Sequence, residues 1–138
     1  MAARYLLDTN ICIALINGAL PVVRARFDKA LDRGAQIHVP TAVAFELWYG
    51  VAKSNRPELN AKRVEVFFAG PVVLLPFEEG DARTAGHVRA ALERSGKLIG
   101  PYDLLIAGQA LHRDLTLITA NVKEFRRVKA LRWEDWAA

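Results

Sequence analysis

The sequence predicts an α/β fold in which a central, mainly parallel sheet of four to five strands is covered by helices on both faces. Short apolar segments with the composition of buried strands alternate with helical segments along the chain, a pattern typical of parallel sheets. The 138 residues, 52% of them hydrophobic, approach the usual size of one domain. No linker, internal repeat or shift in composition divides residues 1–138, so we predict a single domain.

The predicted strands are short apolar runs that end at polar or turn-forming residues. The first run ends at Asp8-Thr9-Asn10, and the third lies between Pro71 and Gly80. In chain order the predicted strands are residues 5–7, 37–39, 72–77 and 115–119, with 131–133 as a short fifth.

The predicted helices are bounded by residues that favour helix ends. Gly18 and Gly34 close the first two helices, and Pro101 opens the last. That last helix is apolar on nearly every side, so we expect it to be buried. The six predicted helices are residues 11–17, 22–33, 42–53, 58–69, 81–94 and 101–113.

Composition narrows the classes of function. Lys and Arg total 19 against 15 Asp and Glu, and the net charge of +4 is compatible with a polyanionic partner without establishing one. Basic residues gather at 24–33 and 123–132, where a solvated helix face and a phosphate-contacting face are equal alternatives. Cys12 is the only cysteine, which excludes an internal disulfide and a thiolate metal site.

The sequence also lacks membrane and export signals. No apolar run reaches the roughly 18 residues of a membrane span. The N-terminus shows no charged region followed by a long apolar region and a small-residue cleavage site. We therefore expect no membrane partner and a cytoplasmic location.

Four polar side chains are predicted to meet at the carboxyl ends of the strands, where parallel α/β sheets bind ligands. Asp8 follows the first strand directly, and Glu46 lies one to two helical turns after the second. Asp103 stands in the first turn of the helix before the fourth strand, and Asn121 lies just past that strand. If the first strand is central and flanked by the second and fourth, all four groups share one cleft.

Such a cleft is rich in oxygen and has no fixed cation in the local sequence. Carboxylates brought together repel one another unless a cation compensates them. Mg²⁺ fits, as does Mn²⁺, because both take hard oxygen ligands and Mg²⁺ keeps several waters. Such an ion lowers the pKa of bound water and neutralises charge on a phosphate in the transition state. The chemistry indicated is metal-assisted phosphodiester hydrolysis, with nearby basic side chains holding a nucleic-acid backbone.

Ordinary structural roles compete with this interpretation. Asp8, Thr9 and Asn10 are all good N-cap residues, so capping alone could explain that tripeptide. A helix N-terminus also favours negative charge, which could explain Asp103 and, more strongly, Asp81.

Asn121, with Glu124 three residues on, has the spacing of a capping box, which we favour slightly over a metal role for both.

Glu46 is harder to explain by structure alone, because it is the only charged residue between Ala42 and Ala52. An unpaired carboxylate in such apolar surroundings is costly. A functional role for Glu46 is therefore favoured over its main competitor, a salt bridge to an arginine.

Other chemistries have less support in the sequence. His38, His87 and His112 show no metal-binding spacing, and no Gly-x-Ser-x-Gly or phosphate-loop motif occurs. A phospho-acceptor receiver domain shares this length and alternation of elements. The third predicted strand, however, ends in Pro76-Phe77, with no aspartate directly after it to accept a phosphoryl group.

Five segments, in their order along the chain, resemble PIN-domain ribonucleases and, within that family, the VapC-type toxins of type II toxin–antitoxin pairs. The segments are residues 5–11 (YLLDTNI), 41–50 (TAVAFELWYG), 99–107 (IGPYDLLIA), 117–125 (LITANVKEF) and 133–136 (WEDW). The resemblance covers nearly the whole chain, and its specificity comes from the order and separation of the segments together.

The resemblance implies a three-layer α/β/α PIN domain that cleaves RNA with Mg²⁺ or Mn²⁺. It places the ion on Asp8 and Asp103, completes the acidic set with Glu46, and puts Asn121 at a fourth position where the family often has Asp. It also implies a homodimer and silencing by a small VapB-type antitoxin that covers the acidic groove. Four further residues are expected to support the site: Thr9, Asn10, Thr119 and Glu124.

The leading hypothesis is therefore a magnesium-dependent endoribonuclease that acts as a toxin. A PIN-like module that binds RNA or protein without catalysis is an open alternative, and metal-dependent cleavage of RNA distinguishes the two. A receiver-like phospho-acceptor domain is the weaker third alternative.

Overall fold

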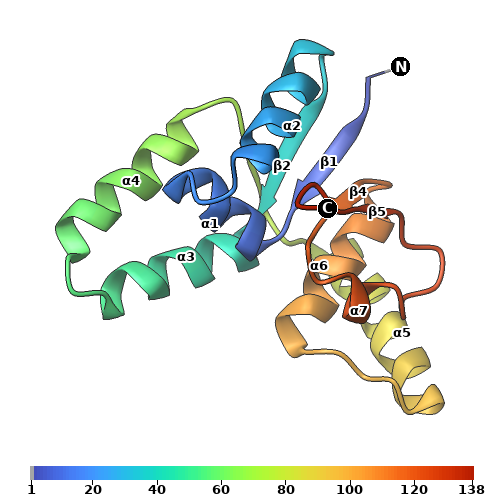
Figure 1. Cartoon of the computed structure of the whole chain (residues 1–138). Coiled ribbons are helices and arrows are strands. Elements are labelled where there is room, and N and C mark those ends of the chain that lie inside the picture. Colours follow the sequence, from blue (N-terminus) through green and yellow to red (C-terminus); the bar gives the residue numbers. More distant parts are fainter. Residues whose placement is uncertain (1) are drawn as a thin grey trace.

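The computed structural model describes residues 2–138, and its centre is one five-stranded sheet (Figure 1). The strand order is β3-β2-β1-β4-β5, and every pairing of neighbours is parallel. In chain order the strands are β1 (Arg4–Leu7), β2 (Gln36–Pro40), β3 (Val73–Leu75), β4 (Thr116–Ile118) and β5 (Trp133–Glu134). The predicted α/β fold and its sheet are confirmed, with β1 at the centre.

Three strands agree with the prediction to within one residue at each end, and β3 and β5 differ from it by two residues at one end. β3 stops at Leu75, because the next carbonyl, of Pro76, accepts hydrogen bonds from Gln109 Nε2 (3.0 Å) and Arg113 Nη2 (3.5 Å) instead of from a neighbouring strand. β5 begins two residues later than predicted, because Leu131 still belongs to the preceding turn. Its amide donates to the Val128 carbonyl at 3.4 Å.

Seven helices connect these strands within the described residues. The six predicted helices are found within two residues of their expected ends, and one four-residue helix after β4 was not predicted. In chain order they are α1 (Thr9–Asn17), α2 (Pro21–Asp32), α3 (Thr41–Lys53), α4 (Pro57–Ala69), α5 (Glu79–Ser95), α6 (Pro101–His112) and α7 (Val122–Phe125).

The path of the chain through the sheet decides which face each helix covers. The chain moves outward from β1 through β2 to β3, and then crosses back to β4 and β5. Because parallel crossovers are right-handed, this reversal places α1–α4 on one face and α5–α7 on the other, as Figure 1 shows. The result is the three-layer arrangement, with a topological switch point where β1 and β4 lie side by side.

The core is continuous on both faces of the sheet. Burial of each large aliphatic side chain contributes about 1.5–3 kcal/mol relative to its exposure to water. α6 is buried as predicted, and at Gly108 its backbone approaches α5 so closely that an added Cβ would lie 2.5 Å from Ala85 Cβ. Cys12 is a free, buried core residue. The following side chains of the three central strands are each at most 1% exposed: Leu6, Leu7, Ile37, Val39, Leu117 and Ile118.

A partly buried ion pair joins the start of α5 to the end of α6. The fully buried Asp81 accepts a hydrogen bond from the Glu78 amide (2.8 Å), which is the helix-start role expected for it. Its two oxygens also accept from Arg113 Nε (3.0 Å) and Nη2 (3.0 Å). Burial alone would raise the pKa of Asp81, but the hydrogen bonds from Arg113 and the Glu78 amide hold it below its usual value.

No single helix of residues 2–138 has the length and apolarity to cross a membrane. Only α1 and α2 taken together, with a bend of 100° between them, meet the criteria of length and composition.

Candidate active site

Asp8 lies at the switch point and holds two elements together. It directly follows the central strand β1, is 5% exposed, and caps α1 by accepting a hydrogen bond from the Ile11 amide at Oδ1 (3.0 Å). Its Oδ2 accepts from the hydroxyl of Thr119, just past β4. Burial raises the pKa of Asp8 against these two hydrogen bonds, and the charge of Glu46 raises it further. Capping therefore accounts for one oxygen of Asp8, and the other faces the end of β4.

A polar network continues from Thr119 to α7. The hydroxyl of the fully buried Thr119 accepts a hydrogen bond from the backbone amide of Asn121 (2.9 Å). The side chain of Asn121 donates from Nδ2 to Glu124 Oε2 (3.3 Å). The Asn121 side chain makes no capping hydrogen bond to α7. The capping-box interpretation of Asn121 and Glu124 is therefore wrong, because the side-chain amide of Asn121 is turned toward the Glu124 carboxylate instead of the helix backbone.

Glu46 projects from α3 toward the start of α1. Its Oε1 accepts a hydrogen bond from Thr9 Oγ1 at 2.7 Å, and its side chain is half-buried. Among residues 2–138 no arginine or lysine forms an ion pair with Glu46, so the arginine salt bridge considered from the sequence is absent there. Asn10 is exposed on α1, and within the same residues it makes no hydrogen bond to these side chains.

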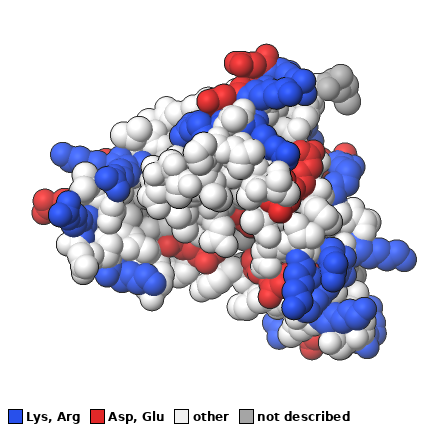
Figure 2. Space-filling model, viewed as in Figure 1, with Lys and Arg blue, Asp and Glu red and all other residues white. Residues whose placement is uncertain are grey.

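Asp103 completes the cluster from the first turn of α6. Burial, a hydrogen bond shared with the Glu124 carboxyl, and the charges of Glu124, Asp8 and Glu46 raise the pKa of Asp103 to about 7. The four carboxyl groups thus lie close enough to influence one another. We call the surface formed by Asp8, Glu46, Asp103, Asn121 and Glu124 the acidic groove. In Figure 2 acidic side chains lie between the α3–α4 side and the α6–α7 side of the molecule.

The contact between Glu124 and Asp103 was not foreseen from the sequence. The spacing of Asn121 and Glu124 predicts a capping box, and no short stretch of sequence relates Glu124 to Asp103. The sequence feature that could have indicated this contact is the apolar residue Phe125, which is fully buried in the structure. Because Phe125 anchors α7 in the core, its neighbour Glu124 is fixed against the end of β4 and the start of α6.

The acidic groove has the donor chemistry of a site for a hard divalent cation. No Lys or Arg of residues 2–138 pairs with any of its four carboxylates, so their charge is uncompensated within the described chain. In that part of the chain no three His, Cys, Asp or Glu side chains are gathered tightly enough to enclose a metal by themselves. Mg²⁺ suits this arrangement, because one or two carboxylates hold it while it keeps several waters.

The raised pKa of Asp103 predicts a pH dependence of stability that the Asp103→Asn variant isolates. In the unfolded chain the pKa of Asp103 is about 4, whereas in the metal-free folded chain it is about 7. Between these values the folded chain binds the additional proton, so the contribution of Asp103 to the free energy of unfolding falls as the pH rises. In EDTA we expect the unfolding temperature of Asp103→Asn, relative to the wild type, to increase from pH 5 to pH 8. A difference that stays constant or shrinks over this range would contradict the shared groove.

Comparison with known proteins identifies the fold as that of a PIN domain, whose family model matches residues 5–131. The tRNA(fMet)-specific endonuclease VapC of Shigella flexneri is 40% identical over 134 residues, which cover 97% of this chain and 98% of that protein. The ribonuclease VapC2 of Haemophilus influenzae is 36% identical over 133 residues, or 96% of this chain and 98% of that one.

Solved structures agree with this assignment. VapBC2 from Rickettsia felis, bound to a DNA fragment from its promoter, matches with a TM-score of 0.90 and 34% identity over 96% of this chain and 98% of that one. DNA-bound VapBC from Salmonella typhimurium matches with a TM-score of 0.89 and 37% identity over 97% and 98% of the two chains. The chain therefore belongs to the PIN-domain family and, within it, to the VapC ribonucleases.

Proposed function

We propose that this protein is the toxin of a type II toxin–antitoxin pair, an endoribonuclease that needs Mg²⁺, with Mn²⁺ as a substitute. The observation that carries the proposal is the acidic groove itself, in which four carboxylates meet at the switch point of the sheet without a basic partner among residues 2–138. Membership of the VapC ribonucleases supports the same activity.

The roles proposed for the residues follow from how each is held. Asp8 and Asp103 would hold the ion, which when bound supplies an acidified water and neutralises charge on the phosphate. Asp8 is fixed for this by Thr119 and the Ile11 amide. Glu46, oriented by the hydrogen bond from Thr9 Oγ1, would accept a proton from the attacking water.

Asn121 and Glu124 are assigned to positioning. Their mutual hydrogen bond and the bond from the Asn121 amide to Thr119 fix both side chains at the end of β4. Glu124 shares a hydrogen bond with Asp103 and so sets the orientation of that carboxylate. Asn121, as a neutral amide, is suited to donate a hydrogen bond to a phosphate oxygen of the substrate. Asn10, which is exposed and makes no contact with the carboxylates, has no assigned role in this scheme.

The substrate we propose is RNA, and tRNA(fMet) is the first to test. The relative from Shigella flexneri is named for cleavage of that tRNA, at 40% identity. A chain that cleaves RNA inside its host acts in the cytoplasm, which is the location we propose.

The partner we propose is a VapB-type antitoxin. The neighbouring structures from Rickettsia felis and Salmonella typhimurium are VapBC assemblies. An uncompensated acidic groove is suited to a cationic side chain of an inhibitor, because an opposite charge there removes the repulsion among the carboxylates.

A homodimer is also proposed. Trp48 and Tyr49, which could have been core residues, are 39% and 58% exposed on α3, and Phe45 beside them packs against Tyr102 with ring centroids 5.6 Å apart. Exposed aromatic side chains of this kind are enriched at protein interfaces. Sedimentation that shows only monomer at micromolar concentration would contradict this assignment.

The activity is tested with the purified chain and a tRNA(fMet) transcript. We expect internal cleavage in Mg²⁺, loss of cleavage in EDTA, and recovery when Mg²⁺ or Mn²⁺ is added back in excess. Co-purified antitoxin should suppress cleavage. Binding of the tRNA without cleavage in either metal would favour the non-catalytic module instead, and undiminished cleavage after exhaustive chelation would exclude the metal-dependent mechanism.

A further inference from the structure

Four basic side chains surround a hollow beside the acidic groove. A cavity of about 480 Å³ is lined by Lys97, Lys123, Arg126 and Arg127, all of them exposed. We call this cavity the basic hollow. In Figure 2 Lys and Arg side chains gather at the lower right, on the side of the molecule where Figure 1 shows α6 and α7, next to acidic side chains nearer the centre of the view.

The basic hollow and the acidic groove share the same structural elements. Lys123 precedes Glu124 on α7, and the loop that begins at Lys97 leads into α6, whose first turn carries Asp103. Arg127 Nη1 donates to the Leu98 carbonyl at 3.3 Å, which ties that loop to the end of α7. The hollow and the groove are therefore carried by the same two segments, the loop into α6 and the helix α7.

The four cations of the basic hollow have no acidic partner among residues 2–138, whereas other basic residues are already engaged. None of the four takes part in an ion pair in that part of the chain. On α2, by contrast, Arg26 donates to the carbonyls of Asp135 (3.0 Å) and Ala138 (3.2 Å). Lys29 and Arg33 of the α2 cluster also form no ion pair in that part of the chain. The cluster around α7 is therefore distinguished by its place beside Glu124 and Asp103, and not by free charges alone.

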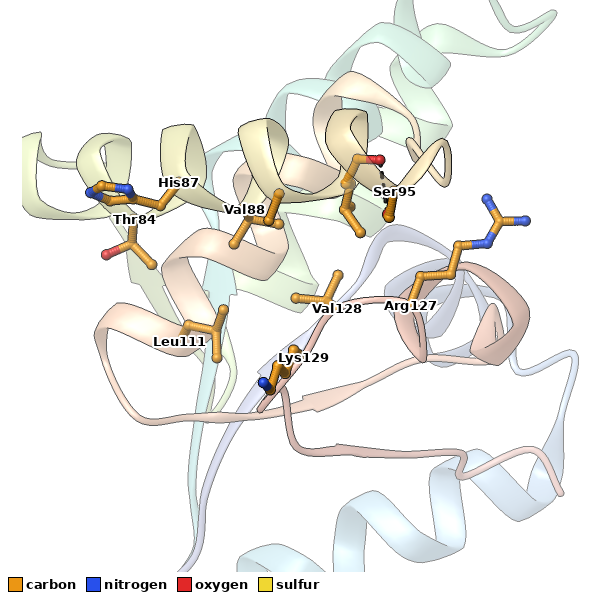
Figure 3. A pocket seen from close by; sticks show the side chains of 10 residues that line it. Thr84, His87, Val88, Ser95, Leu111, Arg127, Val128 and Lys129 are labelled. Atoms are coloured by element: carbon orange, nitrogen blue, oxygen red, sulfur yellow. Dashed lines mark hydrogen bonds between the residues drawn. The ribbon is translucent and has the colours of Figure 1, made fainter.

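Arg127 belongs to the basic hollow by its charge, although it also borders a second cavity. That cavity, of about 390 Å³, lies between α5 and the segment after α7, and its lining combines five apolar side chains with Thr84, His87, Ser95, Arg127 and Lys129. Figure 3 shows the Arg127 guanidinium directed away from Leu111 and Val128 of this cavity. The charge of Arg127 is therefore turned away from this second cavity.

We propose that the basic hollow binds a backbone phosphate of the RNA next to the bond that the acidic groove cleaves; this proposal rests on the proposed ribonuclease function. Clustered cations repel one another, and a phosphate removes that repulsion. The planar guanidinium of arginine matches phosphate oxygens with two parallel hydrogen bonds. Because phosphate contacts carry no sequence information, the hollow holds the RNA in register and contributes to affinity, not to the choice of base.

The test removes two charges from the basic hollow in the full-length chain. For Lys123→Gln/Arg126→Gln we expect KM for tRNA(fMet) to rise about tenfold or more, while kcat changes less than about twofold. The slope of log KM against log salt should decrease by about 1–2, as expected for the loss of one or two phosphate contacts. The matched control is Lys29→Gln/Arg33→Gln, which removes two exposed charges from α2 and its end and should leave KM and the salt slope unchanged.

Three outcomes overturn the proposal. The two double variants could share the same KM and salt slope. The α7 variant could lose kcat with KM unchanged, which would indicate damage to the groove instead of lost RNA contacts. It could also bind the co-purified antitoxin more weakly with KM intact, which would assign the hollow to an acidic protein partner.

If the wild type does not cleave tRNA(fMet), the ribonuclease proposal has failed separately. The same two variants are then compared for tRNA binding in EDTA, where equal affinities overturn the hollow's role.

Discussion

Asp8→Asn is expected to reduce cleavage of tRNA(fMet) at least about 100-fold, a loss of roughly 3 kcal/mol of transition-state stabilisation. The substitution removes the buried negative charge that would bind the ion, but keeps the shape of the side chain. Asparagine is as good an N-cap as aspartate, so its Oδ1 can still accept from the Ile11 amide, as Asp8 does at 3.0 Å. Because burial raises the pKa of Asp8, the neutral variant should unfold at the same temperature as the wild type or a higher one.

The measurement is the single-turnover cleavage rate at saturating Mg²⁺, with circular dichroism and thermal unfolding of the same samples. Asp28→Asn is the matched control, since it removes a carboxylate that is 60% exposed on α2. It should cleave like the wild type. Equal cleavage rates for Asp8→Asn and Asp28→Asn would exclude a role of Asp8 in catalysis.

Arg113→Met is expected to lower the free energy of unfolding by about 3–5 kcal/mol, because it leaves a buried carboxylate without its partner. Arg113 donates to both oxygens of the fully buried Asp81 and, at 2.7 Å, to Glu78 Oε1. Loss of these bonds separates the start of α5 from the end of α6. Since α6 carries Asp103, activity at elevated temperature should fall together with stability.

Urea denaturation measures this effect, and an exposed ion pair supplies the control. Arg83 and Glu79 are 2.9 Å apart on α5, with side chains 74% and 77% exposed. Pairs of this kind contribute at most about 1 kcal/mol, so Arg83→Gln should have little effect. If Arg113→Met is no less stable than Arg83→Gln, the ion pair does not hold the two helices together.

Local sequence signals were sufficient for most of the fold. Gly18, for example, ends α1 with a backbone φ of 66°, a left-handed conformation that glycine adopts without strain. The unpredicted α7 is only four residues long, too short to show a helical repeat of apolar positions. The end of β3 was missed because it depends on Gln109 and Arg113, which approach Pro76 from a distant part of the chain.

The candidate site was less predictable, because one residue can serve two roles at once. Asp8 is both an N-cap and a groove residue, using a different oxygen for each, so the two interpretations of the sequence were never exclusive. For Asn121 and Glu124 the spacing of a capping box was misleading, since tertiary contacts turn both side chains toward the groove. The prediction for Glu46 depended on one feature, because a charge among apolar sequence neighbours requires a polar partner. In the structure the Thr9 hydroxyl donates a hydrogen bond to it.

The proposed activity requires a divalent cation bound between carboxylates contributed by distant segments of the chain. Crystals of the wild type and of Asp103→Asn, soaked in Mn²⁺ and measured at the manganese absorption edge, test it most directly. We expect an anomalous peak in contact with the carboxylates of Asp8 and Asp103 in the wild type, and its loss or marked weakening in the variant. Wild-type crystals with manganese only at other places on the protein surface, although Asp8 and Asp103 are accessible, would contradict it.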